Sequence, residues 1–199
     1  MIAQVMAAGH RALGAVFGLG YGTAMGLPVV GALGCGVLAT VTAAGRLSPD
    51  VDLQRGWRLA DRWTPDELLG RHGPMQHRGL THWWGLALAV TGLWWVALLP
   101  LADSGRGALL AHGAGALLAG WCSHLGADLL FGKADRRSGR GPGIPLLPWW
   151  GHVGLSLNVG GVLERLVSVA LWVVAAGQVL ALVGLLDRVL AAGRTVAGR

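Results

Sequence analysis

Seven histidine and aspartate side chains lie at the edges of the long apolar segments of this sequence. They are His10, Asp50, Asp52, His77, His82, His124 and Asp128. Imidazole nitrogens and carboxylate oxygens are the ligands that many divalent cations take in proteins. Because ionisable groups at membrane depth are costly, a group of them gathered at one membrane edge indicates a functional site.

Two of the motifs have spacings that bear directly on a metal site. His124 and Asp128 are four residues apart, so both can project from one face of a helix. A hydrogen-bonded pair inside the protein is the alternative. His77 and His82 are five apart, which is not a one-face helical spacing, but Gly79 predicts a turn that would bring both rings inward. One interfacial and one solvated histidine would explain the same pattern.

The remaining candidates flank the first two apolar segments. Asp50 and Asp52 stand in the run LSPDVD, where the proline favours the end of a helix. They would be solvated in an ordinary turn, but opposite a histidine cluster they become ligands or a general base. His10 begins the first segment and has the same two interpretations. We predict that the metal ligands are His10, Asp50, His82, His124 and Asp128, with Asp52 and His77 as second choices that would serve as a ligand, a catalytic base or an orienting group.

Lipid is the solvent that the composition indicates for much of the protein surface. Of the 199 residues, 53% are hydrophobic and 13% charged, and the mean hydropathy is +0.54, whereas soluble domains carry about 25% charged residues. The formal net charge of +6 would suit nucleic acid or anionic lipid. In a membrane protein the positive-inside bias explains such a balance, so we expect no nucleic-acid partner.

Five apolar helices are predicted. The apolar stretch 12–44 would form one helix of about 50 Å, whereas the hydrocarbon core measures about 30 Å. Gly26 and Pro28 favour a turn within it, and a single bent or re-entrant element is the alternative. The sequence thus predicts an all-α, polytopic membrane protein, one domain over 1–199. Its five transmembrane or half-membrane helices are expected at about 10–26, 28–44, 81–102, 107–131 and 161–186, with polar loops at 45–80 and 132–160.

A stripe of small residues marks the first of these helices. It consists of Gly14, Gly18, Gly22 and Gly26, which recur every fourth residue. In lipid such a stripe lets two helix backbones approach closely. We expect it to serve packing and no chemistry.

The distribution of positive charge predicts the orientation. With five crossings, twelve of the sixteen basic residues fall on the face that carries the candidate site. They are Arg11, Arg46, Arg55, Arg58, Arg62, Arg71, Arg78, Lys133, Arg136, Arg137, Arg140 and Arg165. Because Lys and Arg in short loops remain inside, we expect this face to be cytoplasmic and the C-terminus to lie outside.

The motifs, in their order, resemble the YdjM-like family of bacterial inner-membrane proteins, which are metal-dependent hydrolases. The matching stretches are His10, SPDVD at 48–52, HRGLTH at 77–82, SHLGAD at 123–128 and Glu164 after a Pro-rich loop. That family is distantly similar to zinc-dependent phospholipase C, which implies zinc, or else manganese or magnesium, and phosphoester hydrolysis. Two departures are Trp83, where the family has a serine, and Leu129 to Phe131, where it has a threonine.

We therefore expect a hydrolase of the bacterial inner membrane whose site faces the cytoplasm. The bilayer is its partner, and a phospholipid or lipid-linked phosphate would be its substrate. Arg78, Lys133, Arg136, Arg137 and Arg140 could receive the phosphate, although topology and contact with lipid headgroups explain them as well. The alternative is a non-enzymatic metal-binding membrane protein that serves as a structural or partner-docking module. A transporter is disfavoured because the polar residues stop near one face, His112 excepted.

The orientation can be tested with reporter fusions. Fusions after Leu53 and after Gly139 should report the cytoplasm, and a fusion at Arg199 should report the periplasm, because an odd number of crossings separates them. A cytoplasmic reporter at Arg199 would show that 12–44 does not cross twice or that another predicted span is wrong.

Overall fold

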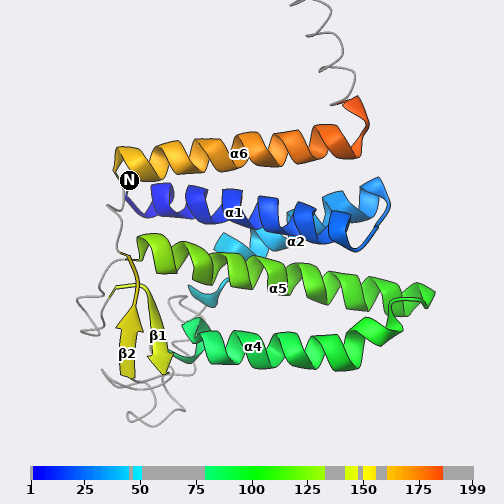
Figure 1. Cartoon of the computed structure of the whole chain (residues 1–199), viewed down its shortest axis with the longest axis horizontal. Coiled ribbons are helices and arrows are strands. Elements are labelled where there is room, and N and C mark those ends of the chain that lie inside the picture. The colour runs from blue at the N-terminus through cyan, green and yellow to red at the C-terminus, as the bar shows by residue number, and fades with distance from the viewer. Residues whose placement is uncertain are drawn as a thin grey trace, which may run out of the picture.

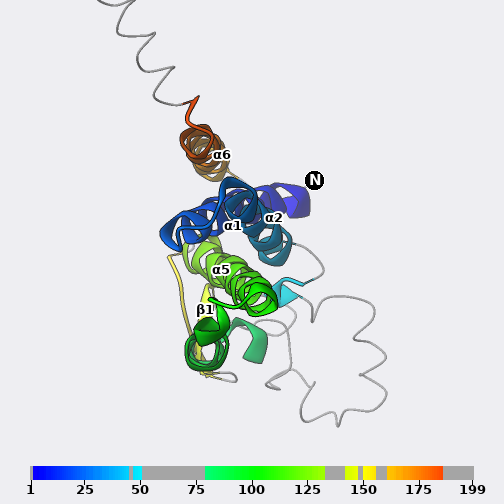
Figure 2. The same ribbon diagram turned by 90° about the vertical axis from the view of Figure 1, so that its right-hand side faces the viewer.

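The structure, a computed structural model, describes residues 2–44, 47–50, 79–132, 142–147, 150–155 and 161–185. Its helices are α1 (Ile2–Ala24), α2 (Val29–Ala44), α4 (Trp84–Leu93), α5 (Gly105–Phe131) and α6 (Val162–Leu182). Their axes run side by side in Figure 1. Seen end-on in Figure 2, α1, α2 and α5 lie between α6 on one outer side and α4 on the other. The predominantly helical fold is confirmed.

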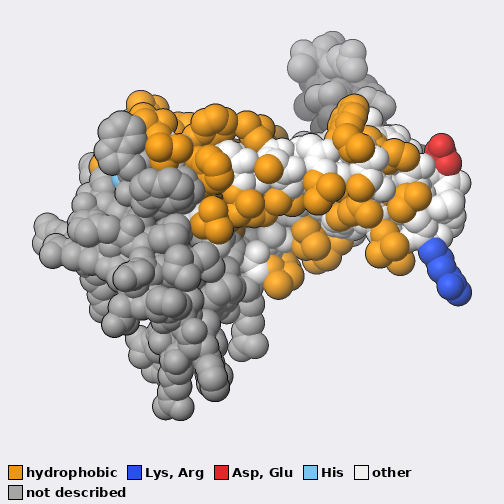
Figure 3. All heavy atoms as spheres, turned by 90° about the horizontal axis from the view of Figure 1, so that it is seen from below, with side chains coloured by type: hydrophobic (Ala, Val, Ile, Leu, Met, Phe, Trp, Pro, Cys, Tyr) orange, Lys and Arg blue, Asp and Glu red, His pale blue; other side chains and the backbone are white. Residues whose placement is uncertain are grey.

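Three of the described segments are long and apolar enough to cross a membrane. These segments are Trp84–Leu101, Gly105–Phe131 and Val162–Leu182, whereas Val29–Ala44 is apolar but shorter. Large apolar side chains are exposed along all three, and the orange surface in Figure 3 shows those on the side of the molecule where α4 lies. Membrane association follows from these faces, because water would not solvate them favourably. The expectation of five crossings, with 10–26 and 28–44 among them, stays a prediction.

The turn predicted near Pro28 is present and ends α1 with a glycine cap. Gly26 has a φ of 66°, a left-handed conformation that glycine adopts without strain. Its amide donates to the Thr23 carbonyl, and the Leu27 amide donates to the Gly22 carbonyl, both at 3.0 Å. These two bonds form a Schellman motif. Gly26 therefore serves the turn and not the packing stripe.

The other three glycines of the stripe bring α1 against α2. A Cβ atom added at Gly14 would stand 2.6 Å from Cβ of Ala43, and one added at Gly22 would stand 2.5 Å from Cα of Ala32. At Gly18 it would collide with the carbonyl oxygen of Cys35. Since no real side chain fits there, the close approach of α1 to α2 depends on these glycines.

Helix α5 packs against α1, α2 and α4, and α1 packs against α2, α5 and α6. α4 continues through a π-helical turn, η4 (Trp94–Leu98), and a 3-10 turn, η5 (Leu99–Leu101). Pro100 explains the change of geometry, because it has no N–H to donate to the preceding turn. Trp94 is buried there, and its indole N–H donates to the Ala111 carbonyl of α5 at 2.8 Å.

A β-hairpin stands within the segment 132–160, for which the sequence predicted a loop, so the all-α prediction was incomplete. Strand β1 (Ile144–Leu147) pairs antiparallel with β2 (Trp150–Val153), and Ile144 lies opposite Val153. A short apolar run bounded by Gly and Pro is typical of strands. The Leu155 amide donates to the carbonyl of Leu129 at 2.8 Å, which attaches the hairpin to the end of α5.

The α1–α2 contact can be tested by adding one methyl group. Gly18→Ala should lower the stability by about 1–3 kcal/mol, as overpacked cores do. Gly34→Ala is the matched control, because a Cβ there meets nothing within 4 Å. Thermal unfolding in detergent, followed by circular dichroism, should give a lower midpoint for the first variant only. Equal midpoints would contradict the role of the stripe.

Candidate metal centre

The structure brings together the five side chains that the sequence proposed as metal ligands. His10 comes from α1, Asp50 from the turn after α2, and His82 from the 3-10 turn η3 (Leu80–His82). His124 and Asp128 lie in the last turns of α5. Two triads have donor atoms within 4.8 Å of one another, and they share His124. One triad consists of His10, His124 and Asp128. The other consists of Asp50, His82 and His124.

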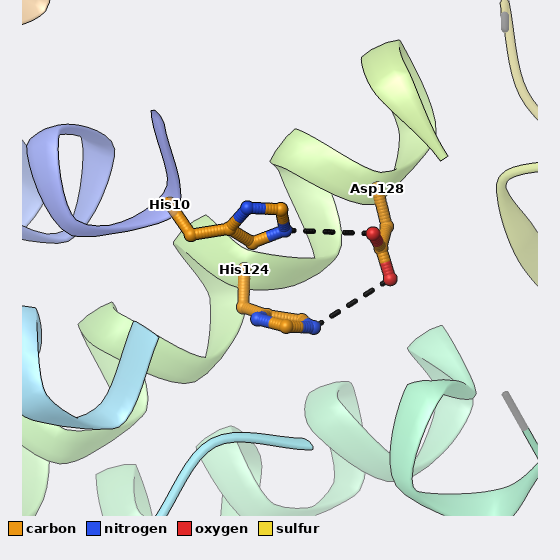
Figure 4. Close-up of side chains that lie close together, drawn as sticks. All are labelled: His10, His124 and Asp128. Atoms are coloured by element: carbon orange, nitrogen blue, oxygen red, sulfur yellow. Dashed lines mark ion pairs between the residues drawn. The ribbon is translucent and has the colours of Figure 1, made fainter. Parts of the chain in front are cut away.

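The carboxylate of Asp128 is the centre of this cluster. Its Oδ1 lies 3.4 Å from Nε2 of His10, and its Oδ2 lies 3.5 Å from Nε2 of His124, as Figure 4 shows. The same Oδ2 is 3.4 Å from Nε2 of His82. Asp128 is buried, so this negative charge depends on its neighbours for compensation. The four-residue spacing of His124 and Asp128 does place both side chains on one helix face.

Asp50 approaches the same point from the turn after α2. Its Oδ1 lies 3.2 Å from Nε2 of His82 and 3.7 Å from Nε2 of His124. The two imidazole Nε2 atoms are 3.3 Å apart. His82 is fully buried, whereas the Asp50 side chain is 41% exposed. Asp50 therefore forms the accessible edge of an otherwise buried cluster.

Three donors of the cluster have the mutual spacing that one cation requires. Nε2 of His82, Nε2 of His124 and Oδ2 of Asp128 are separated by 3.3, 3.4 and 3.5 Å, and Oδ1 of Asp50 lies 3.2 and 3.7 Å from the two imidazole nitrogens. Ligand bonds of about 2.0–2.1 Å in a tetrahedron place neighbouring donors about 3.3–3.4 Å apart. The cluster could therefore bind a metal ion with little movement of its side chains.

Asp50 and His82, which lie outside the membrane-spanning segments, have protonation states that allow them to bind a cation. Burial alone would raise the pKa of Asp50, but the hydrogen bond with His82 and the charges of His124 and His82 outweigh it and lower the pKa to about 2. Burial lowers the pKa of His82, against the hydrogen bond with Asp50. Asp50 is therefore ionised and His82 is neutral near pH 7, the forms in which both bind metals.

Hydrogen bonds behind the cluster orient the histidine rings. Nδ1 of His124 lies 2.6 Å from the carbonyl oxygen of Ala43, which can only accept, so Nδ1 donates, and in the neutral ring Nε2 presents its lone pair to the cluster. Nδ1 of His82 lies 3.1 Å from Oγ1 of Thr81. The Trp121 indole donates to the Thr81 carbonyl at 2.9 Å, which holds η3 against α5. Such outer partners are typical of metal-binding histidines.

Ala43 and Thr81 are supporting residues that were not predicted from the sequence. Thr81 could have been found from its place beside His82. A backbone carbonyl such as that of Ala43 has no signal in the sequence. Trp83 donates its indole N–H to the Leu146 carbonyl of β1 at 2.8 Å. It therefore anchors the hairpin beside the cluster.

The other residues that the sequence singled out either lie outside the described residues or occupy other positions in the fold. Asp52 and His77, the proposed base and orienting group, lie outside the described residues, as do the arginines and the lysine proposed for phosphate. Glu164 is buried in the first turn of α6, where it lines a small crevice with His10 and Phe131.

His112 lies one to two turns from the start of α5, with Nδ1 3.1 Å from the Tyr21 hydroxyl. It is twelve residues, or about 18 Å of helix, from His124.

Comparisons with protein-family models, with curated proteins and with solved structures found no match for this chain. The geometry of the cluster and the motifs therefore carry the functional inference.

Metal binding can be tested by removing one imidazole from α5. His124→Ala should lower the metal content of protein purified after zinc loading from about one equivalent to near zero, because neighbouring water replaces a buried nitrogen donor poorly. His112→Ala removes the same group from the same helix and should keep the metal. Elemental analysis measures both. The site would be refuted by equal metal content in the two variants.

Proposed function

We propose that this protein is a zinc-dependent hydrolase embedded in the bacterial inner membrane, acting on a phosphoester at the cytoplasmic face. The observation that carries the proposal is the set of three buried donor atoms, from His82, His124 and Asp128, that lie 3.3–3.5 Å from one another with the Asp50 carboxylate beside them. Two imidazole nitrogens in that set favour zinc over magnesium, which prefers six oxygens. Manganese is the next candidate.

The unequal burial of the donors favours a catalytic site over a purely structural one. Catalytic zinc sites hold the ion with three protein ligands and keep the fourth position for water. His82, His124 and Asp128 are buried, whereas the side chain of Asp50 is 41% exposed. Water can therefore enter beside Asp50, and there the carboxylate would orient it and accept its proton. A divalent ion in this position would lower the pKa of that water toward neutrality.

The phosphoester is proposed from the motifs and from the position of the cluster. Those motifs resemble the YdjM-like hydrolases, whose distant relatives cleave phosphoesters. The cluster lies at one end of the bundle, in the last turns of α5 and beside the start of α4. If α4 and α5 span the bilayer, this end reaches the depth at which lipid phosphates lie. The excess of basic residues on this face favours the cytoplasmic side.

The second candidate is a metal centre that only fastens the helices together. Four protein donors around one ion are also the rule for structural zinc, and the cluster joins α1, the turn after α2, η3 and α5. In that case the protein would be a docking or structural module. Asp50 distinguishes the two functions, because it would be a structural ligand in one and the partner of a water molecule in the other.

Asp50→Ala should retain most of the bound metal and lose about 10²–10⁴-fold in turnover, the usual contribution of a general base. His124→Ala should lose both metal and turnover, and His112→Ala should keep both. The assay is zinc-dependent phosphate or headgroup release from lipid phosphoesters and from a soluble aryl phosphoester. Loss of the metal in Asp50→Ala, together with no turnover by the unaltered protein, would favour the structural centre and contradict the hydrolase.

A further inference from the structure

We propose that a crevice beside the metal centre holds an apolar chain of the substrate, so that the substrate is a phosphate carried on a membrane lipid. This inference rests on the proposed function and names its substrate class. The crevice has a volume of about 340 Å³, within the range of ligand sites in proteins. Its walls include Leu47, Pro49, Thr81, Leu117, Leu118 and Trp121.

The crevice lies next to the metal centre, because residues adjacent in sequence to the proposed ligands line it. Pro49 and Thr81 line it and directly precede Asp50 and His82. Trp121 lies one helical turn before His124, and its indole closes the wall through its bond to the Thr81 carbonyl. The same short segments therefore carry both the ligands and part of the crevice wall.

The crevice also has the direction that a lipid requires. Along α5 its wall runs from Trp121 back to Leu118 and Leu117, so it extends about 10 Å from the level of His124 toward the middle of the helix. α5 is long and apolar enough to span a membrane. A lipid with its phosphate at the cluster would thus extend its chain toward the membrane interior, as it does in the bilayer.

A larger apolar crevice serves as a contrast. It has a volume of about 680 Å³ between α1, α2 and α6, with Leu33, Val37 and Trp172 among its lining residues. None of its lining residues is a proposed ligand or a sequence neighbour of one. It therefore offers an apolar chain no anchored headgroup.

Binding of the phosphate at the metal centre would determine which lipid occupies the crevice. Inside a bilayer an apolar wall gives little hydrophobic driving force, because lipid tails are as apolar as the wall. A chain would therefore occupy the 340 Å³ crevice preferentially only if its phosphate were held at the metal centre. Occupancy should depend on both the phosphate and the metal, unlike that of ordinary boundary lipid.

The experiment is photolabelling of the zinc-loaded full-length protein in phosphatidylcholine vesicles. The probe is phosphatidic acid with a diazirine in one acyl chain, and diacylglycerol with the same chain is the control lipid. Mass spectrometry should locate the phosphatidic acid label at Leu117–Trp121, and the label should fall at least about fivefold with diacylglycerol or after chelation. Leu118→Trp, which fills the crevice, should remove it, whereas Val37→Trp in the larger crevice should not.

Labelling requires no turnover, so its outcome is separate from that of the hydrolase assay. Equal labelling by diacylglycerol, or labelling of the larger crevice alone, would overturn the lipid subsite even if a soluble phosphoester were cleaved. The labelling map of the unaltered protein decides this without any variant, should Leu118→Trp fail to fold. Metal- and phosphate-dependent labelling without hydrolysis would support the subsite and count against the hydrolase.

Discussion

A buried carboxylate surrounded by three imidazoles is the interaction on which the rest of the structure depends. Asp128 is buried and approaches His10, His82 and His124 at 3.4–3.5 Å. Moving such a charge out of water is costly unless a positive charge or hydrogen bonds compensate it. With Asp50 added, two carboxylates meet in one cluster, and a divalent cation would balance both.

The helical framework can be understood as the means of assembling this cluster. Gly14, Gly18 and Gly22 let α1 lie against α2, which brings His10 and the end of α2 to the same side of α5. The end of α2 then supplies the Ala43 carbonyl that orients His124. Packing among small residues therefore brings the polar groups of the cluster within reach of one another.

Local rules predicted the parts of the site that lie within single elements. The helix containing His124 and Asp128 and the turn before Pro28 follow from helical periodicity and from turn chemistry. The β-hairpin was missed because its apolar strands are four residues each and stand in a segment rich in Gly and Pro. The Ala43 carbonyl was missed because its role arises only when α2 packs against α5, whereas Thr81 could have been found from its place beside His82. Asp52 and His77 lie outside the described residues, so their roles stay predictions.

The central claim is that His and Asp side chains of this cluster bind one zinc ion, and X-ray absorption at the zinc edge tests it most directly. Purified, zinc-loaded protein should give about four nitrogen or oxygen ligands at about 2.0–2.1 Å, with the multiple scattering typical of imidazole. His124→Ala should lose that signal. A zinc environment with sulfur ligands, six water-like oxygens, or no histidine scattering would contradict the account.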